Sequence, residues 1–238
     1  MSSLDPLRPH LWPGYTAHWT ETQWLILEAL SDRRNPGGQV ERAVTKMLCA
    51  VDGPLGRTLA RIFTDLRGLP VNENAEMIDP NHYADPPGNH APDMAVRDAA
   101  WDRLLLVVEG KKGAKINFAE KSCPRGIEAC NQVICYPSNC WTSPATLTGT
   151  SFLWLHPQDT NPWASGWHEG HLGNRRHEES VGGPEQLRRL VDNQRVAIDL
   201  WDTATWEDLV KRVQALHDPA AGVIATIIST WIERPVSP

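Results

Sequence analysis

The sequence predicts an α/β protein in which a short β-hairpin is flanked by helices. The clearest strand is the run 104–110, which is rich in Leu and Val and typical of a strand buried on both faces. The preceding run, 93–96, can pair with this strand through the polar turn 97–103. Two earlier segments, 39–51 and 55–66, carry apolar residues at helical spacing. These patterns predict helices packed on a sheet.

Caps, prolines and apolar runs predict the remaining elements. A capping box predicts a helix over 21–31. After the hairpin, Pro124 opens a predicted helix that ends at Pro137, because proline favours a first helical turn. The run 147–155 then predicts a strand that extends the sheet. In the C-terminal part we expect a helix, an edge strand and two further helices, over 184–192, 195–200, 203–217 and 220–232.

Length and composition favour one large globular domain. We expect an N-terminal arm, N-terminal helices, a catalytic core, a long loop and a C-terminal part with helices and an edge strand, over 1–19, 20–70, 90–155, 156–184 and 185–238. A formal charge of −6 argues against indiscriminate coating of nucleic acid, but it is compatible with a local basic groove. No apolar run approaches the ~20 residues that span a bilayer, and the N-terminus lacks a signal pattern. We therefore expect a cytoplasmic protein without a membrane partner.

The end of the central strand carries groups that suggest chemistry. Glu109 and Lys111 lie two residues apart, so they share one face of the strand. Burying such groups costs desolvation unless they pair or bind a ligand. Across the hairpin, Asp93 can lie near Glu109, and two clustered carboxylates stay ionised only beside a cation. Mg²⁺ is the natural partner, and an adjacent ammonium can act on a metal-bound water or a phosphate.

Pro92-Asp93, fifteen residues, then Glu109-Gly110-Lys111 resembles the motif of the PD-(D/E)xK nuclease superfamily. The resemblance implies a restriction-endonuclease-like fold, with an αβββαβ mixed sheet flanked by helices, N-terminal helices and a C-terminal helical extension. It also implies Mg²⁺, for which Mn²⁺ can substitute, held by Asp93, Glu109 and the Gly110 carbonyl. Lys111 would position the attacking water and stabilise the charge on the phosphate.

A second motif follows the first. Gln132 and Tyr136 lie four residues apart on the predicted helix and resemble the Gln and Tyr after the ExK of RecB-type nucleases and lambda exonuclease, where they contact substrate or catalytic groups. Glu41 resembles the helical Glu that superfamily members carry near the metal; Glu28 competes for this role, and a solvated surface Glu is the alternative. His90 is a further candidate, since some relatives place a His near the metal.

The implied activity is metal-dependent hydrolysis of phosphodiester bonds, in DNA, by an enzyme of restriction, repair or phage defence. The alternative is a nuclease-fold subunit that binds nucleic acid or scaffolds a larger complex without cutting. Many relatives act as dimers, so a homodimer or a protein partner is compatible with either. The basic residues expected to contact nucleic acid are Lys112, Lys115, Lys121, Arg125, Arg175 and Arg176.

The segment 156–184 is long, unpatterned and rich in Trp, His and Arg. Three interpretations stay open: a nucleic-acid-binding loop, an ordered cover that packs its Trp residues, and a protein of another class whose zinc is held by His168, His171 and His177. Some RecB-type relatives hold an iron–sulfur cluster, but Cys123, Cys130, Cys135 and Cys140 include no Cys-x-x-Cys. These cysteines are better interpreted as ordinary thiols.

Overall fold

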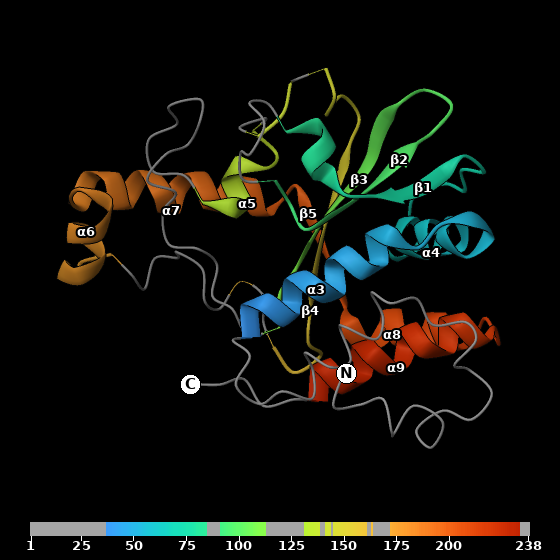
Figure 1. Cartoon of the computed structure of the whole chain (residues 1–238). Helices are drawn as coiled ribbons and strands as arrows, with labels where there is room; N and C mark the ends of the chain where they lie inside the picture. Colours follow the sequence, from blue (N-terminus) through green and yellow to red (C-terminus); the bar gives the residue numbers. More distant parts are fainter. Residues whose placement is uncertain are drawn as a thin grey trace.

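The computed structural model describes residues 37–84, 91–112, 131–138, 141–143, 145–160, 163 and 172–233. It shows an α/β protein with an open, mixed sheet of five strands in the order β1-β2-β3-β4-β5 (Figure 1). The strands are β1 Ala75–Ile78, β2 Met94–Asp98, β3 Arg103–Gly110, β4 Ser151–His156 and β5 Trp201–Thr205. The first two pairings are antiparallel and the last two are parallel.

The predicted hairpin is confirmed as β2 and β3. Met94 pairs with Val108, so the next residues outward, Asp93 and Glu109, lie opposite each other at the open end of the ladder. A bulge between Val96 and Arg97 shifts the register near the turn. β3 is buried over most of its length because it has strand neighbours on both sides and helices on both faces. The hairpin therefore brings two carboxylates together at one end of a rigid, central strand.

Helices cover both faces of the sheet (Figure 1). On one face lie α3 Gly37–Ala50, α4 Gly53–Leu66, α8 Trp206–Gln214 and α9 Pro219–Glu233. On the other lie the short α5 Gln132–Cys135 and the longer α7 Pro184–Ile198, and α6 Arg175–Val181 packs against α7. A 3-10 helix, η3 Pro80–Tyr83, follows β1. The predicted helices 39–51, 55–66 and 220–232 are thus confirmed.

Each face has its own apolar core. Met94, Leu106 and Leu153 pack toward α3, α4, α8 and α9, whereas Val107 and Trp154 pack toward α5 and α7. This division follows from the pleat, since successive strand side chains point to opposite faces. Glu109 is two residues beyond Val107, so its side chain points to the same face as that of Val107.

Three predicted elements are wrong in their bounds or type. The strand expected over 147–155 begins at Ser151, because 145–149 form turns in which Gly149 has φ +74. The strand expected over 195–200 is the end of α7, whose buried face runs through Gln194 and Ala197, and the true edge strand is β5. The helix expected from Pro124 cannot be continuous through Asn131, whose extended backbone caps α5.

Other elements were not predicted or lie elsewhere. β1 and η3 occupy a segment that reads as polar and turn-rich, and α6 lies within the predicted long loop. The helix predicted over 203–217 is shorter and begins at Trp206, where Thr205 caps it by accepting a hydrogen bond from the Asp208 N–H. The arm 1–19 and the predicted helix 21–31 lie outside the described residues. Among the described helices, none has the length and apolar character needed to cross a membrane.

Candidate active site

Three carboxylates from three separate elements converge on the ammonium of Lys111. Glu41 comes from α3, Asp93 precedes β2, and Glu109 lies near the end of β3. The Lys111 Nζ lies 2.5 Å from Glu109 Oε1, 3.6 Å from Glu41 Oε1 and 3.9 Å from Asp93 Oδ2. The sequence thus predicted correctly that Asp93 and Glu109 meet across the hairpin, and Glu41 joins them.

Backbone hydrogen bonds hold this cluster in place. The Gly110 N–H donates to Asp93 Oδ2 at 3.0 Å, and the Lys112 N–H donates to Glu41 Oε2 at 3.1 Å. The Lys111 N–H donates to the Leu155 carbonyl at 2.9 Å, which ties the end of β3 to β4. Two of the carboxylates are therefore oriented by the chain segment that carries Lys111, so a shift of that segment would disturb the whole cluster.

Burial makes the electrostatics of the cluster strong. The Glu109 side chain is only 1 % exposed, and burial together with the charge of Asp93 raises its pKa to about 8, against the opposing effect of Lys111. Burial also raises the pKa of Glu41. The pKa of Lys111 is raised as well, because three carboxylates outweigh the effect of its own burial. The ammonium therefore stays charged at every physiological pH.

The cluster holds more carboxyl groups than Lys111 can balance. With all three ionised, one ammonium would leave a formal charge of −2 in a nearly buried site, so the metal-free protein keeps a proton on Glu109 up to about pH 8. Glu109 Oε1 contacts the ammonium, but its buried Oε2 has no hydrogen-bond partner among the described residues. Carboxylate oxygens are the ligands that Mg²⁺ prefers, so the donor set fits a divalent cation. The described residues hold no preformed cage of three Asp, Glu, His or Cys side chains, and here Lys111 lies between the carboxylates.

Gln132 and Tyr136 lie beside the cluster but are largely buried. The Tyr136 side chain packs against Trp141 and Trp201, and its hydroxyl donates to the Ala91 carbonyl at 3.2 Å. Burial and the nearby charges of Glu109 and Asp93 raise the Tyr136 pKa well above its ordinary value, and a Gln132 hydrogen bond opposes this. Tyr136 thus tethers the segment that leads into Asp93. The buried Gln132 Oε1 has no hydrogen-bond partner among the described residues.

Two Trp residues that the sequence analysis did not single out support the segment 110–112. The Trp206 Nε1 donates to the Lys111 carbonyl at 3.1 Å, and the Trp206 and Trp231 rings meet edge to face with centroids 4.9 Å apart. The Lys112 ammonium donates to the Trp231 carbonyl and lies 5.8 Å from the centre of its ring. One indirect sign of this support is present in the sequence: Gly110, which lies between Glu109 and Lys111, leaves space for a neighbouring side chain.

That glycine leaves room for the Trp206 ring. A Cβ at Gly110 would lie 2.5 Å from Trp206 Cζ2, closer than real contacts allow. We expect Gly110→Ala to destabilise the protein by about 1–3 kcal/mol, because the buried Trp206 cannot move away from Trp231. The free energy of unfolding, measured by urea denaturation, tests this. Gly222→Ala is the matched control, since a Cβ there meets nothing within 4 Å and alanine favours the α9 helix; equal effects would contradict the expectation.

The remaining predicted residues do not join the cluster. The Lys112 ammonium donates to the Trp231 carbonyl of α9. Its expected contact with nucleic acid stays a prediction. Arg175 and Arg176 lie on α6, at the end of α7 remote from β2 and β3 (Figure 1), and Arg175 Nε pairs with Glu179 at 2.8 Å. His177 also lies on α6. The other predicted residues fall outside the described part of the chain: Glu28, His90, Lys115, Lys121, Cys123, Arg125, Cys130, Cys140, His168 and His171.

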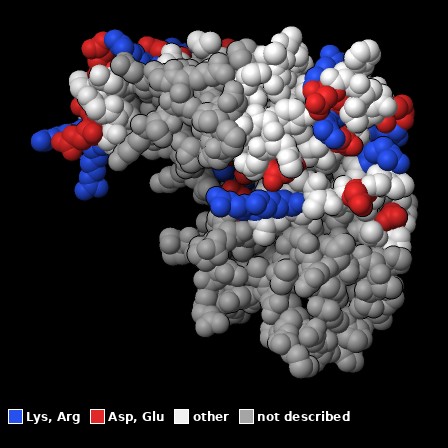
Figure 2. All heavy atoms as spheres, turned by 45° about the horizontal axis from the view of Figure 1, so that its top comes forward, with Lys and Arg blue, Asp and Glu red and all other residues white. Residues whose placement is uncertain are grey.

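Charges of both signs lie on the described surface at one side of the molecule. Figure 2 shows Lys and Arg side chains next to Asp and Glu side chains over the described atoms of one face. Among the described cysteines, Cys135 is buried and Cys49 is half-buried. Comparison with protein-family models, with curated proteins and with solved structures found no match to this chain.

Proposed function

We propose that this protein is a metal-dependent nuclease that hydrolyses phosphodiester bonds, with a restriction-endonuclease-like core. The observation that supports this most strongly is the convergence of Glu41, Asp93 and Glu109 on Lys111, where a buried carboxylate oxygen of Glu109 has no hydrogen-bond partner among the described residues. A purely structural ion pair needs one carboxylate for one ammonium. The excess of acid favours a site whose second cation comes from solution. The motif resemblance favours DNA as the substrate.

Each residue then has a distinct role. Asp93 and Glu109 are the proposed ligands of Mg²⁺, with the Gly110 carbonyl as a further oxygen donor. Bound Mg²⁺ supplies a water of lowered pKa and polarises the phosphate. Lys111 contacts Glu109 in this structure, and in the loaded site its ammonium would orient the attacking water and offset charge on the phosphate. Glu41 holds the Lys112 N–H and so keeps Lys111 facing the site.

A substrate panel tests this proposal. Purified protein is incubated with labelled linear duplex DNA, circular DNA, single-stranded DNA and RNA, each with Mg²⁺, Mn²⁺ or EDTA. We expect cleavage of DNA with either metal and none with EDTA, because three carboxylates cannot approach a phosphate without a cation. Folded protein that binds DNA without cutting any substrate would instead support the nuclease-fold binding subunit. Cleavage that persists in EDTA would contradict the proposed chemistry.

A further inference from the structure

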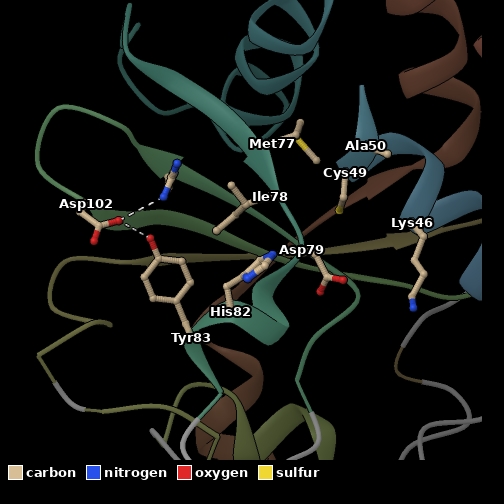
Figure 3. Close-up of a pocket in the computed structure, with 10 residues that line it drawn as sticks. Lys46, Cys49, Ala50, Met77, Ile78, Asp79, His82, Tyr83 and Asp102 are labelled. Atoms are coloured by element: carbon tan, nitrogen blue, oxygen red, sulfur yellow. Dashed lines mark hydrogen bonds and ion pairs between the residues drawn. The ribbon is translucent and has the colours of Figure 1, made fainter. Parts of the chain in front are cut away.

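A pocket of about 700 Å³ opens on the side of α3 that carries Lys46 and Cys49 (Figure 3). It lies between α3, the end of β1, η3 and the β2–β3 hairpin. Its link to the cluster is Cys49, which lines the pocket and whose Sγ lies 4.0 Å from the Asp93 carbonyl oxygen. Burial, with a smaller contribution from Asp79, raises the pKa of this thiol to about 12, so it is a neutral wall rather than a nucleophile. The volume is in the range that holds a small organic ligand.

One wall of the pocket is a fixed aromatic ring. The Tyr83 hydroxyl donates to Asp102 Oδ1 at 2.5 Å, and Arg97 Nη1 lies 3.3 Å from the same oxygen. Arg97 Nε also pairs with Glu76, so the guanidinium is balanced by two carboxylates. The Tyr83 hydroxyl is thereby held by a hydrogen bond, which fixes the position of the ring. Figure 3 shows this ring at the opposite side of the pocket from Lys46. A preorganised ring costs little entropy when a flat ligand stacks on it.

The rest of the lining combines an apolar floor with two basic side chains, those of Lys46 and His82. Met77 and Ile78 form part of the floor. Asp79 also lines the pocket; its Oδ1 accepts from the N–H and side-chain amide of Asn81, and these neutral donors orient the carboxylate without balancing its charge. Among the described residues, Lys46 and His82 have no ion-pair partner, and both are exposed on the pocket lining. The pocket therefore offers a flat apolar surface next to an uncommitted ammonium and an imidazole.

We propose that this pocket binds one nucleotide of the substrate strand, next to the phosphate held at the carboxylate cluster. The base would lie against Tyr83 and the apolar floor, and its phosphate would face Lys46 and His82. Base stacking on an aromatic ring is tolerant of sequence, whereas an ammonium recognises the phosphate as a point charge. This inference rests on the proposed nuclease function and names the part of the substrate that positions the strand.

Nucleoside monophosphates are the probe, because they report on the pocket without cleavage. Binding of the four deoxynucleoside 5′-monophosphates to the full chain is measured by isothermal titration calorimetry in EDTA. We expect Tyr83→Leu and Lys46→Gln each to weaken binding by roughly tenfold, and Tyr83→Phe, which keeps the ring, to bind like the unchanged protein. Lys46→Gln is a surface change, so it tests the inference even if Tyr83→Leu folds poorly. Lys211→Gln, on exposed α8 surface, is the matched control.

The outcome separates this inference from the proposed function. Binding that depends on Tyr83 and Lys46 supports the pocket even if no nucleic acid is cut. DNA cleavage that continues at full rate in Lys46→Gln and Tyr83→Leu, with no measurable monophosphate binding, would overturn the pocket and leave the nuclease proposal standing. Monophosphate binding unchanged in both variants would also overturn it, because the ligand would then lie elsewhere.

Discussion

We expect Asp93→Asn and Lys111→Ala each to lower the rate of the proposed DNA cleavage by at least about a hundredfold. Asp93→Asn would remove the charge proposed to bind the metal. Lys111→Ala would remove the ammonium proposed to act on the water and the phosphate. The measurement is the initial rate on the substrate preferred in the panel, at saturating Mg²⁺. Lys211→Ala is the control, because Lys211 lies on the exposed face of α8 and pairs only with Asp208 among the described residues. Cleavage that survives both site variants would refute the assignment.

We expect the same two variants to differ in their effect on folding in EDTA. Lys111→Ala leaves three carboxylates facing one another without their ammonium, which costs about 3–5 kcal/mol of unfolding free energy. Asp93→Asn removes one of the surplus charges and keeps an oxygen for the Gly110 N–H, so its stability is equal to or above that of the unchanged protein. Urea denaturation distinguishes them. An inactive but fully stable Asp93→Asn protein shows that activity was lost through chemistry rather than through unfolding.

The stability of the metal-free protein falls as the pH rises from about 5 to about 8. Glu109 has a pKa of about 8 in the folded state and an ordinary value of 4.5, so between these limits the folded chain keeps a proton that the unfolded chain loses. This single group contributes a slope of at most about 1.4 kcal/mol per pH unit. Urea denaturation in EDTA at several pH values measures the slope, and Glu109→Gln removes this contribution.

Metal should reverse the trend. If Glu109 is a ligand of Mg²⁺ as proposed, it must be ionised to bind the metal, so we expect the affinity for Mg²⁺ to rise with pH up to about 8 and binding to release a proton. Glu185→Gln, on the exposed face of α7, is the control for loss of a carboxylate. Identical pH slopes for Glu109→Gln and the unchanged protein would show that Glu109 is not the group that holds the proton.

The hairpin was predictable because its signals are local. The apolar run of β3 and the turn before it lie within one short stretch, and strand alternation alone places Glu109 and Lys111 on one face. Helices with an apolar stripe were predictable for the same reason. β1 was not predicted, because its four residues lie among turn residues and are too few to show the alternation of apolar and polar side chains that marks a strand. The predicted end of helix α7 was too early, because its last turn, which includes the exposed Val196, has the pattern of an apolar edge strand.

The candidate site was predictable only in part. Glu41 was singled out by resemblance, and no local pattern places a residue of α3 against the end of β3. Trp206 and Trp231 were missed because their partners lie far away in the sequence, and a Trp at a helix start gives no sign of which backbone it supports. The start of helix α5 was not predicted, because it depends on Asn131. The side chain of Asn131 caps the helix, and its extended backbone interrupts the helical pattern expected there.

The contact between Lys112 and Trp231 joins residues 119 positions apart, and Trp231 lies on the last described helix. A ribosome releases these segments at different times, and domains fold only after their contacting parts are available. A growing chain that already carries Glu41, Asp93, Glu109 and Lys111 therefore still lacks the support that holds the segment after β3. We therefore expect the acidic centre to gain its full support only after synthesis has passed α9.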